Sequence, residues 1–385
     1  MRSRYIITDF NLFGGLHCET SAVRKIFLYN NLPISEEFLF GLGGGIGFIY
    51  WYVKQMPAPM VGGRGGGRYF IENAAYRAGA SITVHRTMSS KKGHAWLLEK
   101  LEAQQPVVIY ADIACLPYTG VPEDAHFGQH ALVVYGVDEG ANTVYISDRG
   151  QRGVTVTVDE LKRARASKYP PWPPQHAIFE FSLPKALEIS KEKVVDALTT
   201  TVDKMLNPPI RNIGLKGIQK WAELILQWPE IFPDERLWQA LYQGFIYIET
   251  GGSGGSAFRP MFVRYLQEVE ERFPMSGLDA VISKYQEAGK IWSKIATRLL
   301  PDEYPMLHQV RKWILEQNQV GEEQKPGALK RMLEINHAID ANKDTIMGEV
   351  AQAAEFLPLA QKWIIRLYEV EKEAIRSLQQ TLKRE

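Results

Sequence analysis

Short runs of β-branched and aromatic residues recur between Pro106 and about Leu183, and turn residues separate them. The runs read PVVIYAD, ALVVYGVD, TVYISD, GVTVTV and AIFEFSL. Apolar runs of this length, bounded by glycine, aspartate and asparagine, are typical of β-strands. The pattern therefore predicts a β-sheet in this part of the chain.

After Pro184 the apolar positions change to helical spacing, as in GIQKWAELILQW, FRPMFVRYLQEVEERF and LAQKWIIRLYEVEKEAIRSLQQTL. This period predicts a second half that is mostly α-helical. A chain of 385 residues exceeds one ordinary domain of roughly 100–200 residues. We therefore expect an α+β protein with two domains, 1–185 and 186–385, divided near residues 183–187.

A cysteine stands just ahead of a predicted amphipathic helix that runs from Thr20 to Asn30. One face of that segment is apolar, at Ala22, Val23, Ile26 and Phe27. Cys18 would lie at the start of the helix, where unpaired N–H groups and the positive end of the helix dipole favour a thiolate. A small buried thiol is the other interpretation, and position alone leaves both open.

A cysteine nucleophile needs a histidine to take its proton and a third group to orient that histidine. In FGQHALVVYGVDEGANTVYISDRG, His130 opens one predicted strand, Asp148 closes the next, and DEGAN (138–142) forms the turn. If the strands pair as a hairpin, the two side chains lie roughly opposite each other. Each could instead be structural, as a strand-end histidine and a turn aspartate. His17 and His126 are the competing histidines, with His126 placed on the substrate side or in a structural role.

Other polar residues are weaker candidates for the site. The backbone N–H of Cys18 and the amide of Asn11 are the candidate oxyanion donors, although Asn11 could equally be a turn residue. Asp112 and Tyr118 are placed at the cleft, near a packed Cys115. Arg259 follows the glycine-rich stretch ETGGSGGSAFR and either faces the active site or pairs with Glu249.

Composition narrows the partners and the chemistry. With 45 basic and 44 acidic side chains the net charge is +1, so we expect no nucleic-acid or membrane partner. The N-terminal MRSRYIITDF lacks the apolar run of a secretory signal, which predicts a cytoplasmic protein with reduced cysteines. The longest apolar stretch, at 38–53, is shorter than the ~18–20 residues of a membrane span. There is no HExxH motif and no paired CxxC, so no metal is expected.

The stretches HCETSA, FLFGLGGGIGFIYW, YADIACLPY, FGQHALVVYGVD and VYISDRG together resemble the N-terminal domain of the butirosin biosynthesis BtrH family. The helical half, with YIETGGSGGSAFRPMFVRYLQEV, resembles the uncharacterised helical domain that usually follows it. The resemblance covers nearly the whole chain. It implies a papain-like cysteine fold followed by a helical domain.

By this resemblance, Cys18 is the nucleophile, His130 the base and Asp148 the orienting group. The implied activity is an acyltransferase that moves an aminoacyl group from the phosphopantetheine thioester of an acyl carrier protein to an amine, with no bound cofactor. Related peptidases carry a glutamine upstream of the cysteine, whereas this chain has Asn11 at a different spacing. A papain-like peptidase or amidase, or a catalytically silent binding module, are the alternatives. Whether the long C-terminal helix forms a homodimer stays open.

Overall fold

The computed structural model describes residues 4–54, 56, 58–65 and 67–385. The chain forms two compact units, and each draws on more than one stretch of sequence. Unit 1 comprises Met1–Glu36, Gly79–Leu187 and Gln317–His337, and unit 2 comprises Glu37–Ala78, Glu188–Glu316 and Ala338–Glu385. The chain passes from unit 1 to unit 2 after residue 187, close to the predicted boundary. The domain limits 1–185 and 186–385 themselves stay a prediction.

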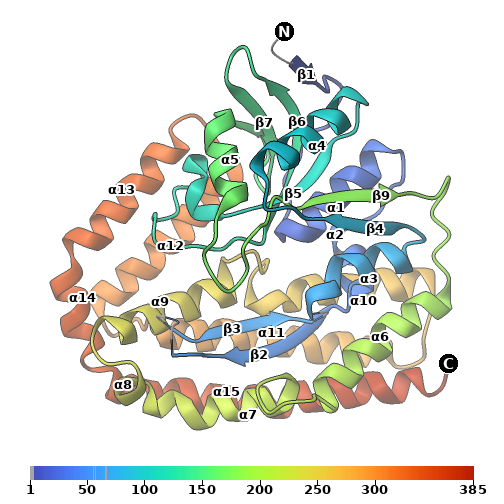
Figure 1. Ribbon diagram of the computed structural model, residues 1–385. Helices are drawn as coiled ribbons and strands as arrows, with labels where there is room; N and C mark the ends of the chain where they lie inside the picture. The colour runs from blue at the N-terminus through green and yellow to red at the C-terminus, as the bar shows by residue number, and fades with distance from the viewer. Residues whose placement is uncertain (1–3, 55, 57, 66) are drawn as a thin grey trace. The chain divides into compact units, whose positions relative to one another are not determined.

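Unit 1 is built on an antiparallel sheet that, within the described residues, has seven strands in the order β4-β9-β5-β6-β7-β8, with β1 also paired to β6 (Figure 1). The strands are β1 (Arg4–Ile6), β4 (Ser81–His85), β5 (Val107–Ala111), β6 (His130–Asp138), β7 (Thr143–Ser147), β8 (Gly153–Val156) and β9 (Ile178–Ser182). β5 and β6 are buried almost throughout, which explains why their sequences are continuously apolar.

Helices pack against this sheet, and α1 lies on its two central strands, β5 and β6. The helices of unit 1 are α1 (Cys18–Tyr29), α4 (Ser90–Glu102) and α5 (Val158–Ala166), with the short turns η2 (Ile113–Cys115) and η3 (Pro117–Thr119). The apolar face predicted for α1 is confirmed, because all four of its residues are buried. The unit also takes in the end of α12 (Pro305–Glu323) and the start of α13 (Ala328–Ala341).

Unit 2 is mostly helical, as the spacing after Pro184 predicts, and holds a small two-stranded sheet. Its elements are α2 (Glu36–Leu42), β2 (Ile46–Trp51), β3 (Met60–Arg64), η1 (Gly67–Tyr69), α3 (Phe70–Arg77), α6 (Lys191–Leu206), α7 (Gly214–Leu224), η4 (Ile225–Gln227), α8 (Trp228–Ile231), α9 (Glu235–Glu249), η5 (Ser256–Phe258), α10 (Arg259–Arg272), α11 (Leu278–Leu299), α14 (Lys343–Val350) and α15 (Ala353–Leu382). The α+β class is therefore confirmed, with helix and antiparallel sheet first and helices after.

The long apolar stretch at 38–53 belongs to unit 2, where it forms most of α2 and all of β2. Its interpretation as buried protein is confirmed for most of its length. Phe48 stacks on Trp221 with ring centroids 5.8 Å apart and lies 5.9 Å from Trp292. The aromatic side chains of this segment therefore fill a helical core, a partnership that short-range sequence patterns do not reveal. Across the described residues, none of the helices is both long and apolar enough to cross a membrane.

The ion pair expected between Arg259 and Glu249 is wrong. Arg259 is fully buried at the start of α10, and its Nε donates to Oε1 of Glu371 at 2.6 Å. Its other nitrogens donate to backbone carbonyls of the same unit. Glu249 instead accepts a hydrogen bond from the backbone N–H of Ser256 at 3.4 Å. Positive φ angles at 256–258 turn the chain before α10, so that Arg259 meets a residue more than 100 positions away.

Candidate active site

Cys18 is the first residue of α1 and is half-buried. His17 caps this helix, and its Nδ1 accepts a hydrogen bond from the backbone N–H of Thr20 at 3.4 Å. The ring of His17 is thus used locally, although it is next to the cysteine in sequence. The predicted location of Cys18 at a helix start is confirmed, which places it at the positive end of the helix dipole.

His130 opens β6, and Asp148 directly follows the last residue of β7. The imidazole Nε2 of His130 lies 2.7 Å from Oδ2 of Asp148. The two residues are only 4% and 7% exposed, so their charges interact in a poorly solvated environment. With Nε2 bonded to the carboxylate, Nδ1 is the ring nitrogen left for a nucleophile. Cys18 is close enough to this histidine to contribute to the raised pKa of its imidazole.

The predicted hairpin between β6 and β7 is confirmed, but direct opposition of its two polar ends is wrong. Next to the turn Asp138 pairs with Thr143, so the turn is centred later in the chain than expected, and a register shift further along β6 makes Val133 the partner of Ser147. Continued by one residue, this register places Asp148 opposite Leu132, so that His130 is a diagonal neighbour on the same face of the sheet. Diagonal positions remain within reach of long side chains, and the imidazole spans the gap.

The pair has strongly shifted pKa values. Burial alone would lower the pKa of His130, but the charge and hydrogen bond of Asp148, together with Cys18, raise it from 6.5 to about 10. Burial would raise the pKa of Asp148, but His130, Arg149 and Tyr118 outweigh it and hold this pKa well below its usual range. At neutral pH the pair is therefore an imidazolium and a carboxylate, with a sulfur beside the imidazolium.

Two further side chains hold Asp148 in place. The hydroxyl of Tyr118 donates to Oδ2 of Asp148 at 2.8 Å, the oxygen that His130 also contacts. Lys25 donates from Nζ to the backbone carbonyl of Asp148 at 2.8 Å and to Ser21 Oγ at 2.7 Å, which ties α1 to the end of β7. Burial lowers the pKa of Lys25 to about 8, although the charges of Asp148 and Glu36 oppose the shift. The sequence pattern identified Tyr118 only as a cleft residue.

A buried glutamate supports the turn that precedes the cysteine. Glu36 is 4% exposed, and its carboxylate accepts hydrogen bonds from the backbone N–H groups of Leu16 and His17, the latter at 2.8 Å, and from Thr20 Oγ1 at 2.9 Å. A carboxylate at this point satisfies N–H donors at the beginning of α1. Sequence reasoning missed Glu36, because the residue lies 18 positions after Cys18 and starts a different helix.

The remaining candidates take different places. Asn11 is exposed in the segment ahead of α1, and its oxyanion role stays a prediction. Asp112 is fully buried; its carboxylate accepts hydrogen bonds from Nδ1 of His126 at 2.8 Å and from Ser167 Oγ at 2.5 Å. Asp112 and His126 therefore bind each other. Arg259 is fully buried and bonded to Glu371, so the structure adds no support for Arg259 as a substrate residue.

Comparison with known families gives two adjacent matches. Residues 17–149 match the domain described as butirosin biosynthesis protein H, N-terminal, and this range includes Cys18, His130 and Asp148. Residues 159–322 match a domain of unknown function, DUF4872. The comparison with curated proteins gives no match.

Proposed function

Because the chain carries a BtrH N-terminal domain followed by a DUF4872 domain, we propose that it is a cysteine-dependent acyltransferase of natural-product biosynthesis. Its donor is an acyl or aminoacyl thioester on the phosphopantetheine of a carrier protein, and its acceptor is an amine. The observation that carries the proposal is the buried contact between His130 and Asp148, 2.7 Å long, beside a cysteine at a helix start. This is the arrangement of a papain-like nucleophile.

The proposed reaction has two halves. The thiolate of Cys18 attacks the carbonyl carbon of the thioester, a new carbon–sulfur bond forms, and the pantetheine sulfur leaves with the proton of the His130 imidazolium. The neutral imidazole then takes a proton from the amine as its nitrogen attacks the acyl-enzyme, and the sulfur of Cys18 leaves as thiolate. Asp148 stays ionised and stabilises the imidazolium in both halves.

The charge state of His130 supports this sequence of events. The imidazolium is the proton source for the leaving pantetheine thiol. The supporting contacts from Tyr118, Lys25 and Glu36 fix the aspartate and the turn before the cysteine, so that orientation is set before substrate binds. All of these groups lie in unit 1.

Intact-protein mass spectrometry after incubation with simple acyl-pantetheine thioesters tests the proposal. We expect a mass gain equal to the acyl group in the wild type and in Cys115→Ser, and none in Cys18→Ala. Cys115 is the matched control because it is also a free, half-buried thiol. Burial and the charge of Asp112 raise its pKa, so it stays a thiol at neutral pH.

The second half-reaction separates transfer from hydrolysis. Addition of amines to the acyl-enzyme should yield amide with little free acid. Free acid that forms at the same rate with and without amine would instead identify a peptidase or amidase type of enzyme. No acylation, together with iodoacetamide labelling of Cys18 that is no faster than that of Cys115, would leave a binding module and refute catalysis.

A further inference from the structure

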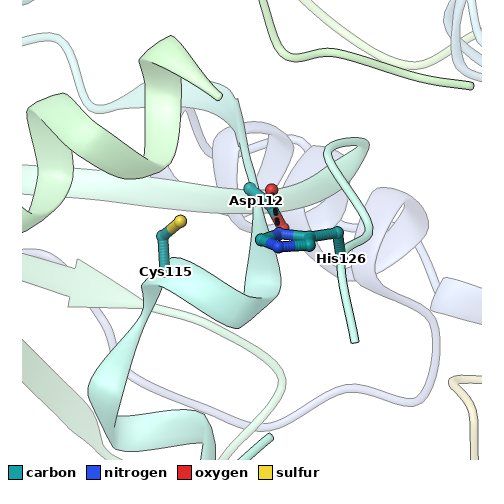
Figure 2. A group of neighbouring side chains, drawn as sticks. All are labelled: Asp112, Cys115 and His126. Carbon is teal, nitrogen blue, oxygen red and sulfur yellow. Dashed lines mark hydrogen bonds and ion pairs between the residues drawn. The ribbon is translucent and has the colours of Figure 1, made fainter. Parts of the chain in front are cut away.

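Three side chains with three different donor atoms meet where β5 ends. Asp112 follows the last residue of β5, Cys115 ends the short turn η2 that begins at the next residue, and His126 lies on the loop that leads into β6. One ligand atom of each residue lies within 4.8 Å of those of the other two. In Figure 2 the carboxylate of Asp112 lies against the ring of His126, and Cys115 comes from the next turn of the chain.

The donor set is that of a zinc-type metal ion. Zn²⁺ binds thiolate sulfur, imidazole nitrogen and carboxylate oxygen, and sites with three protein ligands keep a fourth position for water or substrate. Asp112 and Cys115 are separated by two residues, a short ligand spacing that is common in zinc sites. Softer thiolate and imidazole donors disfavour Mg²⁺ and Ca²⁺, which prefer oxygen ligands throughout.

The surroundings hold these donors in place as a metal site requires. The carboxylate of Asp112 is fully buried, and it is anchored by the backbone N–H of Phe127 at 3.1 Å and by Ser167 Oγ at 2.5 Å. The ring of His126 stacks on Tyr169 with centroids 3.3 Å apart. Outer contacts of this kind fix the orientation of metal ligands. Cys115 and His126 are half-buried, which leaves a side from which an ion can enter.

We propose that Asp112, Cys115 and His126 form a binding site for Zn²⁺ or a similar divalent transition metal, with one coordination position open. On binding, the S–H bond of Cys115 breaks, its proton passes to solvent, and a metal–sulfur bond forms without a change of oxidation state. The imidazole of His126 shifts its proton from Nδ1 to Nε2 by exchange with solvent, and the metal replaces the hydrogen bond between Nδ1 and Asp112. The metal joins the two ends of the segment 112–126, and Tyr118 lies within that segment. The metal ligands themselves take no part in the proposed acyl transfer, which uses Cys18.

Cobalt(II) is the probe for the first test, on the full-length protein, reduced and stripped of metal. Tetrahedral Co²⁺ with a thiolate ligand absorbs strongly in the visible and shows a sulfur-to-cobalt charge-transfer band. We expect these bands to saturate at one equivalent and to bleach when Zn²⁺ is added. The charge-transfer band should vanish in Cys115→Ser, and Ser167→Ala should weaken metal affinity about tenfold or more.

Cys18→Ser is the matched control, since Cys18 also lies beside a histidine. It should keep the full cobalt spectrum. A charge-transfer band that is lost in Cys18→Ser and kept in Cys115→Ser would overturn the proposal, as would the lack of any band in the wild type.

A second measurement needs no variant and therefore does not depend on how a variant folds. Wild-type protein is alkylated with iodoacetamide with and without Zn²⁺, and the two cysteine peptides are quantified by mass. Zn²⁺ should slow the alkylation of Cys115 by about tenfold or more and leave the alkylation rate of Cys18 unchanged. Equal rates for Cys115 in both conditions would refute the site, and this result is independent of whether Cys18 forms an acyl-enzyme.

Discussion

The hydroxyl of Tyr118 contributes to the site through Asp148, and Tyr118→Phe removes only that hydroxyl. Its donor bond to Oδ2 of Asp148 is 2.8 Å long, and the same oxygen contacts Nε2 of His130. Because Asp148 is 7% exposed, water does not readily replace the lost donor. The variant therefore keeps the shape of the site and leaves a buried carboxylate with one hydrogen bond fewer.

A hydrogen bond to a charged group contributes about 1.5–3 kcal/mol to stability. The same loss raises the pKa of Asp148, although His130 and Arg149 still hold this pKa down and keep the carboxylate ionised at neutral pH. Each 1.36 kcal/mol corresponds to a tenfold change in an equilibrium constant. Local opening of the β6–β7 hairpin should therefore become roughly 10- to 150-fold more frequent.

Amide hydrogen exchange measured by mass spectrometry is the assay, because it reports opening of the peptides that contain β6 and β7 separately from unfolding of unit 2. Tyr5→Phe is the control, since its hydroxyl donates to the exposed Glu102 at 3.0 Å. A surface change of this kind should alter the free energy of opening by no more than about 0.5 kcal/mol.

Exchange rates of the β6–β7 peptides that differ less than about twofold between Tyr118→Phe and the wild type would refute the reasoning. Such a difference corresponds to a change of less than about 0.5 kcal/mol in the free energy of opening. It would mean that another donor replaces the hydroxyl, or that the contact contributes nothing to the position of the aspartate.

Three other predictions concern the site and the elements around it. Because the pKa of His130 is raised from 6.5 to about 10, its contribution to stability is complete below pH 6.5 and is lost as the pH rises toward 10. Because the pKa of Asp148 is lowered from its ordinary value of 3.8, the contribution of this carboxylate to stability is complete above pH 3.8 and is lost as the pH falls further into the acid range. Melting temperatures measured from pH 4 to 10 should fall above pH 6.5 more steeply in the wild type than in His130→Gln. Parallel curves would contradict a stabilising ion pair between His130 and Asp148. Glu36→Gln weakens three hydrogen bonds at the start of α1 and should cost about 1–3 kcal/mol, seen as faster amide exchange in α1; unchanged exchange there would count against it. Thr157→Ala removes the capping box of α5 and should cost about 1 kcal/mol without altering the rate at which Cys18 is alkylated.

Local patterns were sufficient for much of the candidate site. Apolar residues at helical spacing located the helix that begins at Cys18, and alternation of strand and turn residues located the hairpin that carries His130 and Asp148. These features depend on contacts between residues close in sequence, and the periods of helices and strands report such contacts directly. The direct opposition expected across the hairpin was wrong, since the turn is centred further along the chain than expected, with Asp138 paired to Thr143, and the sequence of a turn does not specify its centre to within one residue.

The two units show what local patterns cannot reveal. The segment 37–78 lies in sequence between β1 and β4 of the seven-stranded sheet but packs in the helical unit 2. The apolar stretch 38–53 within it predicts burial, which the structure confirms for most of its length, but hydrophobic burial is non-directional and does not specify a partner. Arg259 illustrates the same limit, because nothing near it in sequence identifies Glu371 as the residue that neutralises its buried charge.

The sequence by itself determined the class of the protein, its helix-start cysteine, and the histidine and aspartate that stand near it. Only the tertiary structure decided which groups complete their surroundings. Tyr118 and Lys25 reach Asp148 from other elements, and Cys115 meets a histidine and an aspartate of its own. The reason is physical: secondary structure follows from the backbone and near neighbours, whereas a polar side chain finds its partner only after the sheet and helices have packed together.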